Sequence, residues 1–141
     1  MKNQIVLISC VSKKLSKKSI ARSLYVSPLF KLNLQYAEKL KADNIFILSA
    51  KHGLLTLDQE IEPYEQTLNS MPAKEIKGWA NKVIGQIKKC CDVNETEFVF
   101  LAGHKYRKYL IPEMPNVQIP LKGLGIGKQL QRLKILIDQY N

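Results

Sequence analysis

The chain has 141 residues, of which 45% are hydrophobic and 24% are charged, a composition that supports a folded domain and excludes an intrinsically disordered tail. Lysine and arginine number 22 against 12 aspartate and glutamate residues, and the formal net charge of +10 favours polyanions such as nucleic acid or a nucleotide. Without a run of about 18 apolar residues or the long apolar region of a signal peptide, we expect a cytoplasmic protein with no membrane contact.

Apolar runs and helical segments alternate along the chain. The runs are continuous, as expected of strands that are buried on both faces of a sheet. The segments between them carry apolar residues at helical spacing, and two of these segments begin at a proline, which suits the first turn of a helix. In chain order the predicted elements are strand Gln4–Ser9, helix Leu29–Leu40, strand Asn44–Ser49, helix Pro72–Lys89, strand Glu97–Ala102, strand Val117–Leu121 and helix Gln129–Tyr140.

This alternation predicts an α/β fold. Strands that are separated by helices pair in parallel through right-handed crossovers, which place helices on both faces of the sheet. The sequence shows no repeat, low-complexity tract or linker, so we expect one domain over residues 1–141. The predicted architecture is a three-layer α/β/α domain with a mainly parallel, four-stranded sheet.

Three glycines at alternate positions follow the last predicted strand. Gly123, Gly125 and Gly127 precede the last predicted helix, and Lys122 and Lys128 bracket them. A strand, a glycine loop and a helix bring backbone N–H groups and a helix N-terminus up to an anion, usually a phosphate. The spacing matches neither the dinucleotide fingerprint nor the P-loop. The loop therefore predicts a phosphate site, and the alternative is a plain tight turn between strand and helix.

Every predicted strand ends in small, polar or basic residues. Ligands of open parallel sheets bind at the carboxyl ends of the strands, which lie along one edge. Arg107 is the best candidate for bidentate recognition of a phosphate. Besides the glycine loop and Lys128, the predicted phosphate-binding or nucleotide-binding residues are Ser9, Cys10, Ser12, Lys13, Ser49, Lys51, Gly103 and Arg107.

Both histidines of the chain, His52 and His104, also lie at these strand ends. Each is a candidate general acid or base, or a hydrogen-bond donor to a phosphate. The alternative for each is a purely structural hydrogen bond. The three cysteines show no paired C-x-x-C spacing, and no compact group of acidic residues suggests a metal, so we predict neither a metal nor a cofactor.

The segment from residue 54 to residue 68 is acidic and has no clean helical or strand period. Loops of this kind often form the wall or lid of a site. A carboxylate beside a phosphate pocket suits the cleavage of an N-glycosidic bond, and Glu62 and Asp58 are the candidates. Tyr64 and Tyr25 could stack on a base. The alternative is that the acidic residues cap helices and pair with surface lysines.

Several groups of residues spread along the chain form a specific motif set. They are Leu24-Tyr25-x-Ser27-Pro28-Leu29-Phe30, Leu48-Ser49-Ala50-Lys51-His52-Gly53-Leu54-Leu55, Ile61-x-Pro63-Tyr64-x-x-Thr67-Leu68, Trp79, Leu101-Ala102-Gly103-x-x-Tyr106-Arg107 and Pro120-Leu121-x-Gly123-Leu124-x-Ile126-Gly127. This set resembles a small, largely uncharacterised α/β family of bacteria, archaea and phages. It is similar to a domain attached to archaeal tRNA-guanine transglycosylase-like proteins of 7-deazaguanine modification, and more remotely to the uracil-DNA glycosylase fold.

The resemblance implies a link to nucleic-acid bases. The chain has neither the Gly-x-Asp-Pro segment nor the His-Pro-Ser segment of the uracil-DNA glycosylases, so no catalytic residue is carried over from them. From the residues and the resemblance together we expect a nucleotide-binding or nucleic-acid-binding protein that hydrolyses an N-glycosidic bond in a cleft at the strand ends. The alternative is a non-catalytic module that binds RNA or a nucleotide.

Overall fold

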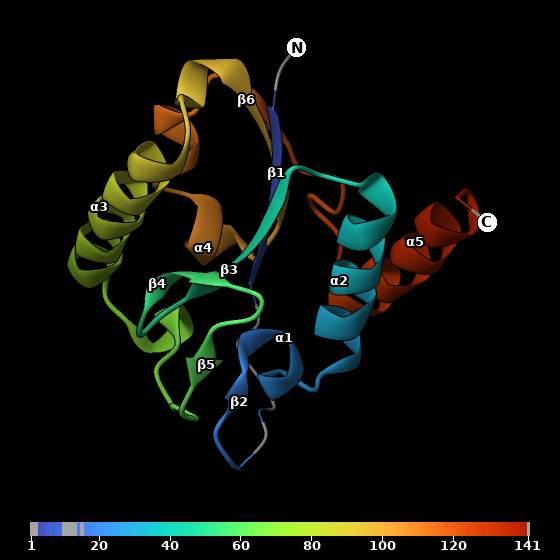
Figure 1. Cartoon of the computed structure of the whole chain (residues 1–141), viewed down its shortest axis with the longest axis horizontal. Coiled ribbons are helices and arrows are strands. Elements are labelled where there is room, and N and C mark those ends of the chain that lie inside the picture. Colours follow the sequence, from blue (N-terminus) through green and yellow to red (C-terminus); the bar gives the residue numbers. More distant parts are fainter. Residues whose placement is uncertain (1–2, 10–13, 15, 141) are drawn as a thin grey trace.

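The computed structural model describes residues 3–9, 14 and 16–140, and its main sheet has five strands in the order β4-β3-β1-β6-β7 (Figure 1). Strands β1 (Asn3–Ser9), β3 (Asn44–Ser49), β6 (Thr96–Leu101) and β7 (Val117–Gln118) run parallel to one another. Strand β4 (Gly53–Thr56) pairs with β3 in the antiparallel direction and forms one edge. The predicted α/β fold with a mainly parallel sheet is confirmed, with a fifth strand that the sequence analysis missed.

Helices cover both faces of the sheet and give the molecule three layers (Figure 1). Helix α3 (Ala73–Cys90) packs on one face, and α2 (Pro28–Leu40) and α5 (Ile126–Asp138) pack on the other. Successive side chains of a strand point to opposite faces. In β1, Val6 and Ile8 join the core beneath α2 and α5, whereas Leu7 joins the core beneath α3. Both faces of β1 are buried, which explains its continuous apolar run.

The start of α2 is set by its first residues. The Ser27 Oγ accepts a hydrogen bond from the Phe30 N–H at 3.2 Å, and Pro28 occupies the first turn, where its missing N–H costs nothing. The helix ends at Lys41, whose φ of 55° is left-handed. These caps fix the register of α2 and thereby determine which of its residues face the sheet.

The acidic segment contains short paired structure that its sequence does not show. Strand β5 (Glu60–Ile61) pairs in the antiparallel direction with β2 (Ser19–Ile20), which leads into the single turn of α1 (Ala21–Leu24). The remaining short elements are η1 (Leu68–Ser70), η2 (Val93–Glu95), α4 (His104–Arg107) and η3 (Ile111–Glu113). Of these, α4 begins three residues after the end of β6 and brings its side chains to the carboxyl edge of the sheet.

The last strand is shorter and the last helix begins earlier than the sequence predicts. Strand β7 ends at Gln118 rather than at Leu121, because the chain then folds into turns in which the Lys122 N–H donates to the Ile119 carbonyl and the Leu124 N–H to the Leu121 carbonyl. Helix α5 begins at Ile126 rather than at Gln129. The glycine loop is therefore partly a turn and partly the first turn of α5.

Candidate functional site

Two cavities lie side by side at the carboxyl end of β6. The smaller has a volume of about 240 Å³ and the larger about 490 Å³. Four residues line both cavities and form a shared wall, namely Ala102, Gly103, His104 and Gln129. Three of these follow β6 directly, so the two cavities occupy the edge of the sheet at which ligands of parallel sheets bind.

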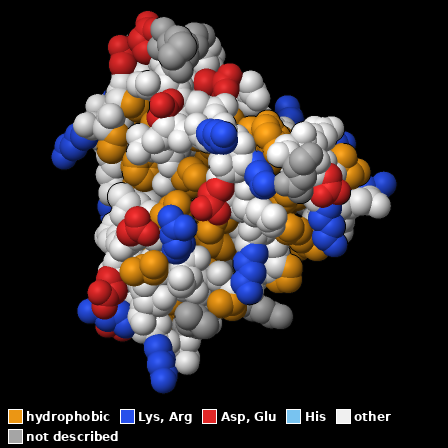
Figure 2. All heavy atoms as spheres, turned by 45° about the vertical axis from the view of Figure 1, so that its right-hand side comes forward, with side chains coloured by type: hydrophobic (Ala, Val, Ile, Leu, Met, Phe, Trp, Pro, Cys, Tyr) orange, Lys and Arg blue, Asp and Glu red, His pale blue; other side chains and the backbone are white. Residues whose placement is uncertain are grey.

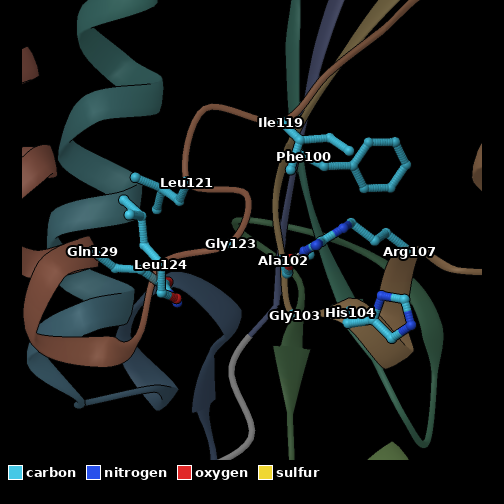
Figure 3. Close-up of a pocket in the computed structure, with 10 residues that line it drawn as sticks. All are labelled: Phe100, Ala102, Gly103, His104, Arg107, Ile119, Leu121, Gly123, Leu124 and Gln129. Carbon is cyan, nitrogen blue, oxygen red and sulfur yellow. Dashed lines mark hydrogen bonds between the residues drawn. The ribbon is translucent and has the colours of Figure 1, made fainter.

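The smaller cavity lies between α4 and the loop that precedes α5. Figure 3 shows Arg107 and His104 on one side and Leu121, Leu124 and Gln129 on the other. The Arg107 Nη1 donates to the Ala102 carbonyl at 2.7 Å, which holds the guanidinium against the end of β6. Burial lowers the pKa of Arg107, because the charged form loses water there. An anion beside this cation would restore the lost solvation.

Of the three glycines in the loop, only Gly123 has a backbone conformation that favours glycine. Gly123 lines the smaller cavity and has a φ of +79°, in the left-handed region that favours glycine. Gly125 is the N-cap of α5 with a φ of −72°, and a Cβ added to Gly125 or Gly127 would meet no atom within 4 Å. Neither packing nor conformation within the described protein therefore explains Gly125 and Gly127.

The larger cavity has an apolar floor and a few converging polar groups. Helix α2 and the first turn of α5 form one side, and the segment after β6 forms the other. Its apolar lining residues include Leu29, Phe30, Leu101, Ile126 and Leu130, and its polar ones are Ser9, Ser27, Asn33, Asn69, His104, Lys105, Tyr106 and Gln129. This combination of an apolar surface with a few placed polar groups is typical of small-molecule sites.

Hydrogen bonds hold the rim of the cavities in place. The Ser9 Oγ accepts from the Gly103 N–H at 3.1 Å and ties the end of β1 to the start of α4. The Lys105 ammonium donates to the Asn69 carbonyl at 3.1 Å, which links α4 to η1. The Gln129 side chain donates to the Leu124 carbonyl at 2.8 Å. With the start of α2, the site is thus assembled from five separate parts of the chain.

Asn33 is buried in the wall of the larger cavity, and its Oδ1 has no hydrogen-bond partner. Its side chain comes from the second turn of α2, the residue is 2% exposed, and its Oδ1 accepts no hydrogen bond. An amide that is removed from water and left unpaired costs about 1–3 kcal/mol in proteins. The three other polar residues that are buried in the described core, Ser27, Ser49 and Thr96, all make hydrogen bonds. Asn33 is therefore an exception within this core.

The end of β3, in contrast, is filled by protein. Ser49 is fully buried, and its Oγ accepts from the His52 N–H at 3.1 Å while its carbonyl accepts from the Trp79 indole at 2.8 Å. Ser49 has no surface that could contact a phosphate, so its predicted ligand role is replaced by a role in the turn. His52 packs edge-on against Tyr64 with a centroid distance of 5.6 Å. Neither Ser49 nor His52 lines either cavity.

The two tyrosines proposed for base stacking are part of the core. Tyr25 is 1% exposed and Tyr64 is 8% exposed. Their hydroxyl groups share a hydrogen bond, Tyr25 also packs on Phe30 at 5.1 Å, and the Lys14 ammonium lies 4.6 Å from the Tyr64 ring centroid. Their rings are occupied by these neighbours, which corrects the prediction that they offer a face to a base.

The two candidate carboxylates lie on the surface. Asp58 has a side chain that is 82% exposed and pairs with the Arg22 Nε at 3.3 Å, and Glu62 is exposed just after β5. Neither residue lines either cavity, and the described lining residues of both cavities include no aspartate or glutamate. The alternative in the sequence analysis was pairing with surface lysines, whereas the partner of Asp58 is an arginine.

The remaining predicted residues divide into flanking and undescribed ones. Lys51 is exposed in the turn after β3, and Gly125, Gly127 and Lys128 lie at the start of α5 beside the cavities without lining them. Cys10, Ser12 and Lys13 fall outside the described residues. Of the predicted set, the structure brings five residues together in the two cavities, which are Ser9, Gly103, His104, Arg107 and Gly123.

The sequence analysis missed several polar residues of the larger cavity, above all Asn33. A signal was present, because Phe30, Asn33 and Ala37 share the buried stripe of α2 at helical spacing. A single asparagine among the apolar residues of a core-facing stripe is a buried polar group. The sequence does not show that the first turns of α2 and α5 line one cavity together with the segment after β6.

The surface charge does not favour an extended ligand on the face that α2 and α5 form. Figure 2 shows lysine and arginine side chains scattered there among hydrophobic and acidic ones rather than gathered in a band. Within the described part of the chain, no three histidine, cysteine, aspartate or glutamate side chains are placed to hold a metal ion. None of the helices described here is long and apolar enough to span a membrane.

Comparison with known proteins places the chain in a family without assigning an activity. Residues 5–135 match the protein family described as Family of unknown function (DUF6884). The chain belongs to this family. No curated protein and no solved structure matches it significantly.

Proposed function

We propose that this member of the family binds a nucleotide at the carboxyl edge of its sheet, with the phosphate in the smaller cavity and the nucleoside in the larger one. The observation that carries the proposal is the wall that the two cavities share. It places His104 and the Gly103 backbone between a cationic pocket and an apolar one. A nucleotide has two matching parts, because its ribose joins an anionic phosphate to a flat and largely apolar base.

The phosphate end is supported by the chemistry of the smaller cavity. Arg107 uses Nη1 to reach the Ala102 carbonyl, which leaves the rest of its planar donor set for a second acceptor. The first turn of α5 adds N–H groups that have no partner within the helix, and that turn contains no acidic residue. The absence of carboxylates among the described lining residues removes the main source of repulsion for an anion.

The nucleoside end is supported by the shape and lining of the larger cavity. Its volume of about 490 Å³ falls within the range of small-molecule sites, roughly 300–1,000 Å³. Leu29, Ile126 and Leu130 provide apolar surface for a base. Ser9 and Lys105 provide polar groups at the rim for a ribose or a second phosphate. We propose a single nucleotide unit rather than a long strand, in keeping with the scattered basic residues of Figure 2.

The proposal concerns binding, the non-catalytic alternative of the sequence analysis. Hydrolysis of an N-glycosidic bond needs a carboxylate at the sugar, whereas Glu62 and Asp58 line neither cavity. The hydrolase hypothesis has its own test. The protein is incubated without metal with nucleotides, DNA and RNA, and free base is sought by mass spectrometry. Release that disappears in Glu62→Gln would extend the function to catalysis.

Calorimetric titration with nucleoside 5′-monophosphates tests the binding proposal. Arg107→Gln removes the cavity cation and is expected to weaken binding about tenfold or more, since hydrogen bonds to charged groups contribute about 1.5–3 kcal/mol. Lys108→Gln removes the same charge from the next residue, which is exposed and lines neither cavity, and should change the affinity less than about twofold. If no nucleotide binds, or if both variants lose affinity equally, the proposal is wrong.

A further inference from the structure

We infer that the outer side of α3 binds duplex DNA by lying in its major groove. This surface is a second site, separate from the two cavities and independent of the proposed nucleotide site. Figure 1 shows α3 as a layer of its own, on the face of the sheet opposite α2 and α5. The buried stripe of α3, which includes Trp79 and Val83, packs on the sheet, so the other side of the helix faces solvent.

The solvent-facing side of α3 is strongly basic. The helix contains five lysines, all of them exposed, and Glu75 is its one acidic residue. Among the described residues, the basic partners of the ion pairs are Lys18 and Arg22, and no lysine of α3 takes part in one. The five lysines are Lys74, Lys77, Lys82, Lys88 and Lys89. Cations gathered on one face in this way attract a polyanion.

Small side chains lie along the middle of this exposed side. At about 3.6 residues per turn, Gly78, Asn81 and Gly85 follow one another along one line, which we call the crest of α3. All three are exposed, and a Cβ added to either glycine would meet no neighbouring atom within 4 Å. Glycine inside a helix costs about 1 kcal/mol relative to alanine. Stability therefore favours alanine at both positions, whereas close approach of a ligand to the helix favours glycine.

Lysines flank the crest on both sides. By the same helical spacing, Lys77 and Lys88 lie on one side of the crest, and Lys82 and Lys89 lie on the other. A cation in the last turn of a helix also interacts favourably with the helix dipole, but Lys74 in the first turn gains nothing from it. The dipole therefore does not explain the lysines at the start and in the middle of α3.

Neighbouring segments extend both flanks. On one side, the ammonium groups of Lys77 and Lys108 lie 5.5 Å and 5.3 Å from the centroid of the Tyr109 ring. On the other side, Gln86 of α3 forms hydrogen bonds with the turn after β3, which carries the exposed Lys51. The basic surface is therefore wider than α3 itself.

The shape of this surface fits the major groove of B-form DNA. That groove is about 12 Å wide and admits an α-helix, and a phosphate backbone runs along each of its sides. The crest would face the base edges, and the two lysine flanks would face the phosphates of the two strands. The exposed side spans residues 74–89, about 22 Å at 1.5 Å per residue. Because the crest offers only one amide to the bases, we expect little dependence on DNA sequence.

Other polyanions fit the surface less well. The major groove of A-form RNA is deep and narrow, which excludes a helix. Single strands bind by stacking on exposed aromatic rings, whereas Trp79 is buried and Tyr109 is half-buried. Helices that bind membrane surfaces insert large apolar side chains, and α3 exposes none. Duplex DNA is therefore the partner that the charge and the shape favour together.

Fluorescence anisotropy with labelled ligands provides the first test. The ligands are a short DNA duplex of mixed sequence, the RNA duplex of the same sequence, one DNA strand alone and polyglutamate. At one low salt concentration, the wild-type protein should bind the DNA duplex at least about tenfold more tightly than the other three. Failure to bind the DNA duplex, or equal affinity for any of the other ligands, would overturn the inference.

Charge removal with a matched control locates the DNA on the molecule. Lys77→Gln combined with Lys82→Gln removes one cation from each flank, and should weaken DNA binding about tenfold or more at about 0.1 M salt. The slope of log affinity against log salt should become shallower by about 2, since each phosphate contact contributes about 0.9. Lys31→Gln combined with Lys134→Gln removes the same charge from exposed positions on α2 and α5, and should change the affinity less than about threefold. Equal losses in the two pairs would show that net charge, rather than α3, determines binding.

Bulk on the crest tests insertion into the groove without a change of charge. Gly78→Leu combined with Gly85→Leu should leave Tm unchanged or raise it, because leucine has the higher helix propensity and both positions face open space. The affinity for the DNA duplex should fall about tenfold or more, since the added side chains hold the lysines away from the phosphates. Unchanged DNA affinity, or a clear fall in Tm, would contradict the role assigned to the crest.

Titration of these variants with nucleoside 5′-monophosphates separates the two sites. None of the substituted residues lines either cavity, so each variant should bind nucleotide as the wild type does. Loss of DNA binding with unchanged nucleotide binding supports a separate site on α3. Parallel loss of both ligands would show that the two sites are not distinct and would overturn the inference.

Discussion

The ends of β3 and β6 look alike in sequence and differ in structure. Both strands are buried apolar runs, and both lead into an alanine, one further residue and a histidine, with Ala50 and His52 in one case and Ala102 and His104 in the other. The end of β6 opens into two cavities that His104 lines. The end of β3 is closed, with Ser49 fully buried and His52 packed on Tyr64.

The path of the chain after each strand makes this difference. After β3 the chain turns back at Gly53, whose φ is +77°, and continues as β4 along the edge of the sheet. Gln86 of α3 then seals the turn by accepting from the Leu54 N–H at 2.9 Å. After β6 the chain enters α4 instead, and the side chains of His104 and Arg107 line the cavities at this edge. The path of the chain after the strand thus decides whether the histidine packs in the protein or lines a cavity.

Substitution of the turn glycine should have the largest effect. Gly53→Ala places a Cβ 2.3 Å from the Gln86 Oε1 and forces alanine into a left-handed conformation. The conformational cost is about 1–2 kcal/mol, and displacement of Gln86 removes a hydrogen bond that contributes about 1 kcal/mol. We expect the free energy of unfolding, measured in urea, to fall by about 2–3 kcal/mol.

Gly103→Ala is the matched control at the other strand end. Gly103 has a φ of −63°, and an added Cβ would meet no atom within 4 Å. This variant should lose less than about 0.5 kcal/mol, as expected of a substitution without a specific structural defect. Equal losses in the two variants would contradict the distinction between a closed and an open strand end.

Trp79→Phe tests the closure of β3 from the side of α3. The Trp79 indole donates to the Ser49 carbonyl at 2.8 Å in a buried position, and Trp79 packs edge-on against Tyr106 at 5.7 Å. Phenylalanine keeps a ring but removes the buried indole donor of the Ser49 carbonyl, so chemical denaturation should show a loss of about 1–3 kcal/mol. Nucleotide affinity should hardly change, because neither residue 49 nor residue 79 lines a cavity. A selective loss of binding without destabilisation would place the ligand at β3 instead.

Gly123→Ala should destabilise the protein, because Gly123 has a left-handed backbone conformation that the other glycines of the loop before α5 do not have. The φ of +79° at Gly123 makes alanine unfavourable by about 1 kcal/mol, whereas Gly127→Ala adds a Cβ in open space within the first turn of α5, where alanine has the higher helix propensity, and should not destabilise the protein. Thermal unfolding of the two variants gives the comparison. If both are equally destabilised, the left-handed conformation of Gly123 does not determine the shape of the loop.

The smallest expected effect is the contribution of His52 to the pH dependence of folding stability. Burial first, and then the charges of Lys51 and Lys82, lower the pKa of His52 below its ordinary value of 6.5. The unfolded chain therefore binds a proton that the folded protein resists, and stability falls as pH drops below about 6.5 towards the lowered pKa. Denaturation at intervals between about pH 7.5 and pH 5.5 should show a shallower fall in His52→Gln than in the wild type. A steeper fall in the variant would reverse the assigned sign.

Part of the candidate site could be predicted from strand ends alone. In a parallel sheet the carboxyl ends lie along one edge, so residues after different strands come together whatever the details of packing. This argument correctly brought Ser9, Gly103 and Gly123 to one place, together with Arg107. It failed for Ser49 because β4 returns along the edge and covers it. The argument contains no information about which strand ends are covered.

The sequence by itself determined the fold class, the buried strands and the main helices, because hydrophobic periodicity and helix-start residues act locally or over one element. Tertiary structure alone decided which strand end stays open and where the unpaired amide of Asn33 lies. Both depend on packing between segments that are distant in the chain, such as β4 against β3 and α5 against α2, which no local pattern in the chain encodes.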